Sequence, residues 1–304
     1  MVSTIKAERA EILEFAAYHL DLGAHRLYIH LDAPEPETFA ALKAHPKVRV
    51  FACDDGYWRK LGTRRPDKHQ ARQTANATRI YRQKAEVDWL IHIDVDEFLW
   101  PEGRVADSLA ALPAEVGCAR VRPVEALAGD GHHFKGFIPA GPDRDATVER
   151  IYPRFGPYVK GGFLSHLAGK LFLRTGLGAV TVKIHNAFLD GQMNPGETEL
   201  ADMLLLHRHA KSWEQWIGAF RYRLEHGSYR AELAPARPRE RGGMTIHEVL
   251  SLIHEAEGEA GLRSFYDELC ADSPELRAAL KAEGLLHKCD LQLAERMGKQ
   301  FNPN

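Results

Sequence analysis

The chain has few cysteines and no long apolar run. Only four of its 304 residues are cysteine, and no two of them form a C-x-x-C pair. A disulfide framework or a zinc knuckle is therefore disfavoured, and we expect reduced thiols. No stretch approaches 18 uncharged apolar residues, and the first residues contain no apolar signal segment. These absences disfavour a secreted or membrane-spanning protein. We expect a cytoplasmic protein without a transmembrane segment, for which peripheral membrane contact stays open.

A marked excess of charge of one sign is also absent. The 40 lysines and arginines nearly balance the 42 aspartates and glutamates, for a net charge of −2. Charge on the whole molecule thus gives no argument for a nucleic-acid partner, and we expect none. The composition is that of an ordinary globular protein. The length fits one large α/β domain or one domain with an appendage.

The first hundred residues alternate short apolar strands with helices. Strands are predicted at residues 2–5, 26–31, 48–52 and 89–93, and helices at 8–22, 36–44 and 71–86. Strands separated by helices indicate parallel βαβ units. The start of the chain therefore predicts an α/β sheet of the nucleotide-binding type.

The remainder of the chain has a different character. Residues 101–209 are rich in glycine and proline, and we expect short strands with long loops that build an acceptor pocket. Helix-starting signals follow at Ser212, Thr245 and Ser273. We therefore predict a catalytic domain over residues 1–211 and a helical extension over 212–304 that packs on it.

The most informative stretch is W-L-I-H-I-D-V-D-E-F-L-W, residues 89–100. An apolar strand ends here on three carboxylates, Asp94, Asp96 and Glu97. Clustered negative charge beside a buried strand is costly unless a positive charge lies close by. A divalent cation that also binds phosphate oxygens, Mg²⁺ or Mn²⁺, would supply it at the edge where α/β sheets bind ligands. The alternative is a solvated acidic loop.

Other polar residues are expected near the same edge. Asp32 follows the second strand and can accept hydrogen bonds from a nucleobase or ribose, or it can cap the turn before the next helix. The remaining candidates end the first strand or share one side of the helix before residue 89, where the alternative is a plain solvated face: Thr4, Lys6, Glu8, Arg72, Gln73, Asn76 and Arg79.

A second apolar run, L-L-L, ends in H-R-H-A-K-S. His207 follows that run directly, and a neutral imidazole can complete a carboxylate metal site. Lys211 can balance phosphate charge. The alternative for His207 is a histidine packed at a strand end, and His166 and His185 are weaker rivals for the metal.

Taken together, these segments resemble the GT-A-fold glycosyltransferases of the family 2-like group that carry a D-V-D-E-F metal motif. The resemblance covers residues 1–100 well, the blocks G-K-L-F-L-R, K-I-H-N and H-R-H-A-K-S less well, and nothing beyond residue 212. Arg208 stands where the family usually has tyrosine, and A-P-E-P follows Asp32 in place of a Ser/Asp-rich turn. The resemblance implies a Rossmann-like, mostly parallel central sheet flanked by helices, with the C-terminal helices as an extension.

It also implies a function. A metal-dependent enzyme of this kind, with Mn²⁺ or Mg²⁺, moves a sugar from a nucleotide-diphosphate donor, UDP-sugar above others, to a hydroxyl acceptor such as a glycan or glycolipid, with inversion. The implied roles are Asp96 as metal ligand, Asp94 as a ribose or second metal contact, His207 as a further ligand, Lys211 at the diphosphate, and Asp32 with Glu8 at the nucleoside.

An inverting transfer needs a general base within hydrogen-bond reach of the acceptor hydroxyl. Glu97 lies beside the metal motif, and Glu125 and Asp130 lie in the predicted acceptor segment. We expect Glu97 or Glu125 in this role and rank Asp130 below Glu125.

Two other functions remain open from the sequence. A phosphatase-like enzyme would use Asp94 as a nucleophile, although that motif normally follows the first strand and has Thr or Val where Phe98 stands. A catalytically idle scaffold would keep the fold and only hold nucleotide.

Overall fold

The computed structural model describes residues 1–84, 86–226, 229, 231 and 233–301. The chain forms two compact units. The first comprises Met1–Arg122, Ala168–Leu205 and the segment from Leu291 onward, and the second comprises Pro123–Leu167 and Leu206–Asp290. These units divide the chain differently from the expected boundary at residue 211, because residues 123–167 group with the later helices and the last helix returns to the first unit.

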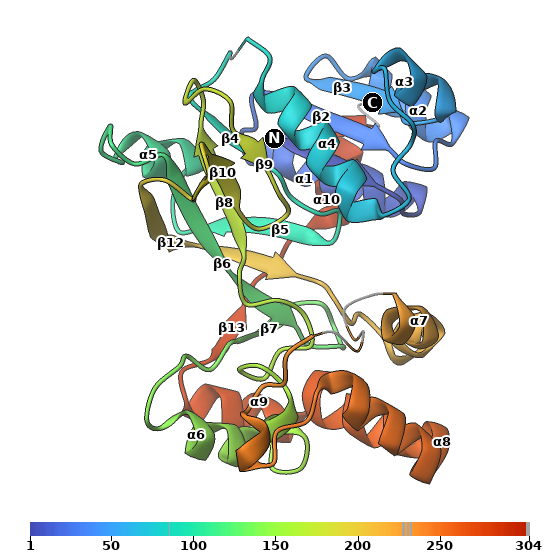
Figure 1. The fold of residues 1–304 in the computed structure, drawn as a ribbon, viewed down its shortest axis with the longest axis vertical. Helices are drawn as coiled ribbons and strands as arrows, with labels where there is room; N and C mark the ends of the chain where they lie inside the picture. Colours follow the sequence, from blue (N-terminus) through green and yellow to red (C-terminus); the bar gives the residue numbers. More distant parts are fainter. Residues whose placement is uncertain (85, 227–228, 230, 232, 302–304) are drawn as a thin grey trace. The chain divides into compact units, whose positions relative to one another are not determined.

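The first unit begins with a parallel sheet, as predicted. Strands β1 (Val2–Ile5), β2 (Leu27–Leu31) and β3 (Val48–Ala52) lie in that order, with β2 paired to both neighbours in parallel. Helices α1 (Arg9–Asp21) and α2 (Pro36–Ala44) connect them. The α/β alternation is therefore confirmed, and the parallel pairing brings the carboxyl ends of β1, β2 and β3 to one edge of the sheet. In Figure 1, β2 and β3 lie with α1 and α2 in the blue, N-terminal part of the ribbon.

Local signals explain where these helices begin. Glu35 precedes α2, and its carboxylate accepts hydrogen bonds from the backbone N–H groups of Glu37 and Thr38. Pro36 occupies the first turn, where its missing N–H costs nothing. Two helices lie between β3 and the next strand: α3 (Asp55–Lys60), which the sequence reasoning missed because it is so short, and α4 (His69–Tyr81).

The strands after α4 change the direction of pairing. Strand β4 (Trp89–Ile91) pairs antiparallel with β8 (Lys170–Arg174), which pairs antiparallel with β6 (Cys118–Ala126). A parallel bridge between Val2 and His92 keeps the end of β4 beside β1. The parallel arrangement thus covers β1–β3 and this bridge, and the antiparallel strands bring Lys170 next to residues 92–97.

The middle of the chain contains longer strands than we expected. Strand β6 has nine residues and β12 (Glu197–His207) has eleven, because each carries enough apolar positions to cross a core. Shorter elements of the first unit complete it: β5 (Glu97–Pro101), α5 (Val105–Ala110), β9 (Thr181–Val182), β10 (Ala187–Leu189) and β11 (Gln192–Met193).

The last helix, α10 (Leu293–Phe301), packs on α1. The guanidinium of Arg296 lies 5.0 Å from the ring centre of Tyr18. Lys299 and Arg296 both form ion pairs with Asp21, with the Lys299 nitrogen at 2.8 Å. Apolar contact and opposite charge therefore attach the end of the chain to the first unit.

The second unit is built mainly from helices α6 (Arg144–Ile151), α7 (Trp213–Glu225), α8 (Ile246–Cys270) and α9 (Pro274–Ala282), with strands β7 (His133–Gly136) and β13 (Leu286–Lys288) paired antiparallel. The predicted starts of α7, α8 and α9 are confirmed, since Ser212, Thr245 and Ser273 accept backbone hydrogen bonds as N-caps. Across the described residues, no helix is long and apolar enough to cross a membrane.

The close approach of Gly169 to Val121 in the first unit can be tested by mutation. Gly169 has φ of +68°, and a methyl group there would approach the backbone oxygen of Val121 to 2.0 Å. We expect Gly169→Ala to lower the free energy of unfolding by about 2 kcal/mol or more, from backbone strain and the clash. Gly298 in α10 meets nothing within 4 Å, so Gly298→Ala is the control. Urea denaturation measures the free energy of unfolding of both variants. Equal values would contradict the close approach of Gly169 to Val121.

Candidate functional site

The carboxylate motif forms a turn between two strands. Strand β4 ends at Ile91 and β5 begins at Glu97, and residues 92–96 connect them. The backbone N–H of Glu97 donates to the backbone oxygen of Asp94 at 3.1 Å, and the N–H of Asp94 donates to the Glu97 carboxylate at 2.9 Å. The D-V-D-E spacing therefore closes a turn on itself before any ligand is considered.

A buried lysine provides positive charge for this turn. Lys170, at the start of β8, is fully buried, and its ammonium contacts Asp94 and lies 3.3 Å from the Glu97 carboxylate. Burial lowers the pKa of Lys170, but the two carboxylates raise it above its usual value. Burial raises the pKa of Asp94, yet Lys170 brings it well below its usual value. Asp94 and Lys170 are thus both charged near neutral pH.

Both carboxylate oxygens of Asp94, a predicted ribose or second metal contact, are engaged within the protein. One carboxylate oxygen of Asp94 contacts Lys170, and the other accepts a hydrogen bond from the side-chain amide of Gln73. Gln73 is itself buried, and its contact with a ligand stays a prediction. Asp96 is half-buried in the turn, and its negative charge opposes the ionisation of Asp94. Metal binding by Asp94 and Asp96 stays a prediction.

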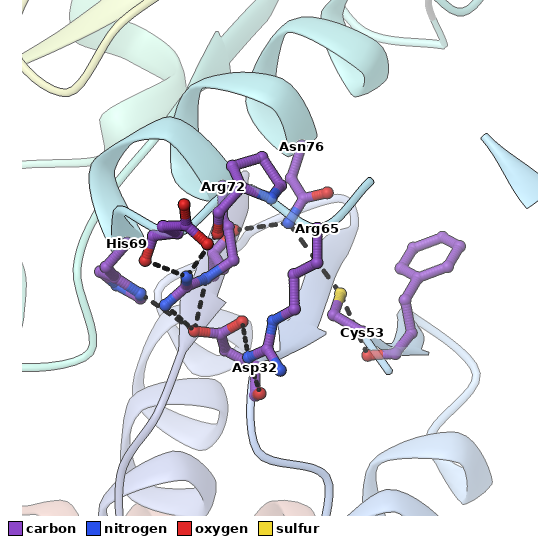
Figure 2. A network of polar contacts seen from close by, with 10 residues as sticks. Asp32, Cys53, Arg65, His69, Arg72 and Asn76 are labelled. Carbon is purple, nitrogen blue, oxygen red and sulfur yellow. Dashed lines mark hydrogen bonds and ion pairs between the residues drawn. The ribbon is translucent and has the colours of Figure 1, made fainter. Parts of the chain in front are cut away.

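Asp32 lies at the centre of a cationic cluster (Figure 2). Its carboxylate is 1% exposed and accepts hydrogen bonds from Arg65 at 2.9 Å, Arg72 at 2.9 Å and His69 at 3.2 Å. Burial raises the pKa of Asp32, but these three partners lower it to about 2. Asp32 therefore holds the two arginines in place, and its contact with a nucleoside stays a prediction.

Helix α4 connects the two clusters. Arg72 binds Asp32 after β2, and the next residue, Gln73, binds Asp94 after β4. Arg72 also donates to the backbone oxygens of Pro66 and Asp67 at 2.7 and 2.8 Å, which orders the loop before α4. Two consecutive residues of one helix thus set the spacing between a basic and an acidic group at the carboxyl edge of the sheet.

Two other residues predicted to contact a ligand, Asn76 and Thr4, form a hydrogen bond with each other. The Asn76 amide donates to the hydroxyl of Thr4 at 3.1 Å and accepts from the hydroxyl of Tyr57 at 2.6 Å. Both Asn76 and Thr4 are buried, so their hydrogen bond joins α4 to β1. Their contact with a ligand stays a prediction. Lys6 and Glu8 are exposed after β1, and Glu8 precedes α1 without a side-chain capping bond. They remain candidates by position alone.

Neither predicted general base suits that role. Glu97 is fully buried beside Lys170. In the second unit, Glu125 is buried 3.1 Å from the ammonium of Lys135 and accepts the N–H groups of Ser165 at 2.8 Å and Leu164 at 3.2 Å. Burial raises the pKa of Glu125, but Lys135, His209 and the bond to Ser165 lower it to about 2. A carboxylate so strongly held is a weak proton acceptor at neutral pH.

The second unit contains a group of histidines at the end of β12. The ring of His207 lies 5.4 Å from that of His166 and 5.2 Å from that of His209, measured between centres. A ring nitrogen of His207 is within 4.8 Å of one in each neighbour. Lys211 follows, half-buried. His185 belongs to the first unit, where its Nδ1 lies 3.0 Å from the oxygen of Gly169. His207 therefore keeps its place as a candidate metal ligand.

Sequence reasoning missed three site residues, Lys170, Arg65 and His69. The available signal was a lysine directly before the apolar residues L-F-L in G-K-L-F-L-R, since a lysine on a buried strand needs an anionic partner. Arg65 and His69 lie in a loop and a helix start that carry no periodic pattern. Their convergence on Asp32 depends on the path of residues 61–68.

Comparison with known proteins adds nothing to this geometry. No family model matches the chain, and no curated protein matches it either.

The role of Lys170 can be tested by its removal. Lys170→Met leaves Asp94 and Glu97 buried without their cation, so we expect a loss of about 3–5 kcal/mol in the free energy of unfolding. Lys47→Met, at an exposed position, should change it by less than about 0.5 kcal/mol. Urea denaturation compares the two. A loss below about 1 kcal/mol for Lys170→Met would show that the carboxylates do not depend on this lysine.

The buried Glu125–Lys135 pair predicts a pH dependence. Because the pKa of Glu125 is about 2 in the folded protein against 4.5 ordinarily, its ionised form stabilises the fold above pH 4.5. That contribution disappears as the pH falls from about 5 to 2. We expect Glu125→Gln to destabilise the protein at pH 7 and the difference from wild type to shrink below pH 5. A difference that stayed constant in thermal unfolding would refute the assignment.

Proposed function

We propose that the protein is a glycosyltransferase of the GT-A type that uses a nucleotide-diphosphate sugar and a divalent cation. The observation that carries the proposal is the pair of contacts from α4, Arg72 to Asp32 and Gln73 to Asp94. They place a basic cluster and an acidic turn on one sheet edge, where open α/β sheets bind nucleotides.

The charges suit the two ends of such a donor. Arg65 and Arg72, with His69 beside them, outnumber the single carboxylate of Asp32, so this cluster favours an anionic ligand. Arginines match phosphate oxygens in pairs. When the sugar leaves, negative charge grows on the diphosphate, and cationic groups fixed in advance lower the energy of that state.

The acidic turn suits a divalent cation most of whose ligands are water and phosphate oxygens. Lys170 and Gln73 engage Asp94, and we assign Asp96 as the carboxylate ligand of Mg²⁺ or Mn²⁺. His207 is a further ligand only as the sequence resemblance implies. Such ions are held by one or two protein carboxylates plus phosphate oxygens and water. When bound, the ion would act as a Lewis acid on the leaving diphosphate. Lys170 would keep Asp94 in place, so that the turn holds its shape as the ligand exchanges.

Other parts of the proposal rest on the sequence. UDP as the nucleotide, a glycan or glycolipid hydroxyl as the acceptor, inversion at the sugar and Lys211 at the diphosphate come from the resemblance in residues 1–100 and the later blocks. The general base is left unassigned, because Glu97 and Glu125 are both held in buried ion pairs. The engagement of both Asp94 oxygens leaves the phosphatase-like alternative without support.

Binding can be tested by thermal unfolding with UDP, GDP or CDP, with and without Mn²⁺. We expect one nucleotide to stabilise the protein only when the metal is present, by about 2.7 kcal/mol at 100 times its Kd. Asp96→Ala should abolish the metal dependence. The control is Asp67→Asn, an exposed carboxylate in the loop before α4. Stabilisation by none of the nucleotides, or an unchanged metal effect in Asp96→Ala, would refute the proposal.

The same preparation separates an enzyme from an idle scaffold. Release of nucleoside diphosphate from a panel of nucleotide sugars would establish turnover, and Asp96→Ala should reduce it by about 100-fold or more. Metal-dependent binding with no release from any donor, with or without glycan acceptors, would instead support the scaffold.

A further inference from the structure

A basic segment stands out in a chain that is nearly neutral overall. Residues 59–68, here called the basic segment, contain five basic residues against one acidic residue, Asp67, although the net charge of the whole chain is −2. The five are Arg59, Lys60, Arg64, Arg65 and Lys68. The excess lies between the end of α3 and the start of α4, within the first unit.

Hydrogen bonds to the rest of the first unit fix the conformation of the basic segment. The backbone N–H groups of Leu61 and Thr63 donate to the oxygen of Trp58, which is itself 1% exposed. Farther along, Arg65 donates to the backbone oxygen and the carboxylate of Asp32. Arg72 donates to two backbone oxygens, those of Pro66 and Asp67. The segment is therefore a shaped surface.

The exposed charges of this segment make few contacts within the fold, although Arg59 and Lys60 lie in the last turn of α3, where positive charge is favourable. Within the described part of the chain, Arg59, Lys60 and Lys68 are exposed and form no ion pair. Arg64 is 91% exposed and approaches Asp67 only to 3.9 Å, a contact that water weakens greatly. Lys68 precedes α4, whose first turn contains no acidic residue. Positive charge at a helix N-terminus is unfavourable, so an anionic partner explains this placement better than stability does.

We propose that the basic segment docks the protein on an anionic lipid bilayer. Leu61 lies among the basic residues and is one of four large apolar side chains exposed in the described residues. A cluster of lysines and arginines with an adjacent apolar side chain meets the two needs of peripheral binding, attraction to anionic headgroups and insertion at the interface. The segment exposes no aromatic ring on which bases would stack, which favours lipid over single-stranded nucleic acid.

Vesicle co-sedimentation tests the proposal with the full chain. The wild type should sediment with phosphatidylglycerol-rich vesicles, remain in solution with pure phosphatidylcholine, and dissociate as the NaCl concentration rises. The double variant Lys60→Glu/Arg64→Glu should bind at least about tenfold more weakly. Leu61→Ser should also weaken binding, and its remaining binding should be the more sensitive to salt.

A matched control separates the site from overall charge. Lys43→Glu/Lys47→Glu makes the same change in net charge at exposed positions elsewhere in the first unit, and it should bind vesicles like the wild type. Equal loss in both double variants would overturn the proposal, as would wild-type protein that ignores anionic vesicles. Tighter, Lys60- and Arg64-dependent binding to a short RNA would assign the segment to nucleic acid instead.

The test is independent of the proposed transferase activity. Metal-dependent stabilisation by a nucleotide should persist in Lys60→Glu/Arg64→Glu. If that variant loses nucleotide stabilisation while wild-type protein does not bind vesicles, the basic segment serves the nucleotide and the bilayer proposal fails. Failure of nucleotide binding in the wild type would leave the vesicle result intact.

Discussion

The ammonium of Lys170, buried against Asp94 and Glu97, is the interaction on which the candidate site depends. Without a positive partner, burial would raise the pKa values of carboxylates at the end of a buried strand, or the carboxylates would bind a cation from solution. Lys170 removes that requirement from within the chain, because β8 runs antiparallel to β4 and starts beside the turn. The motif can then keep its shape with or without a bound ion. Gly169, with its positive φ and its close approach to Val121, allows the lysine to enter at this point.

Two buried ion-pair networks define the carboxyl edge of the first unit, and α4 relates them. Two arginines surround the single carboxylate of Asp32, so positive charge is in excess there. Two carboxylates surround Lys170, so negative charge is in excess there. Opposite local charges at a fixed separation are what a nucleotide diphosphate with its cation requires. The same edge continues into the basic segment, whose base is ordered by Arg65 and Arg72. Arg65 and Arg72 would thus support both the nucleotide site and the basic segment, whereas the exposed lysines of the segment would serve docking alone.

Much of the first hundred residues could be predicted, and the reasons are local. Strands such as 2–5 and 48–52 and the helix 36–44 are marked by short apolar runs, turn residues and caps, which act within a few residues of one another. The three N-caps at Ser212, Thr245 and Ser273 are local in the same sense. The site was harder to predict. Asp32, Arg72, Gln73 and Asn76 were placed in the right region, but their partners were not foreseen, and Asn76 and Thr4 proved to bind each other.

The sequence by itself determined the α/β alternation, the position of the acidic turn after the fourth strand, and the need of that turn for positive charge. Only the tertiary structure decided what supplies the charge, because Lys170 is 76 residues from Asp94 and no local pattern relates them. It likewise decided that Asp32 holds arginines, that Glu125 is held by Lys135, and that the chain divides through β6 and β12. A carboxylate in a sequence has only a charge, whereas its partners, burial and pKa arise when distant segments pack together.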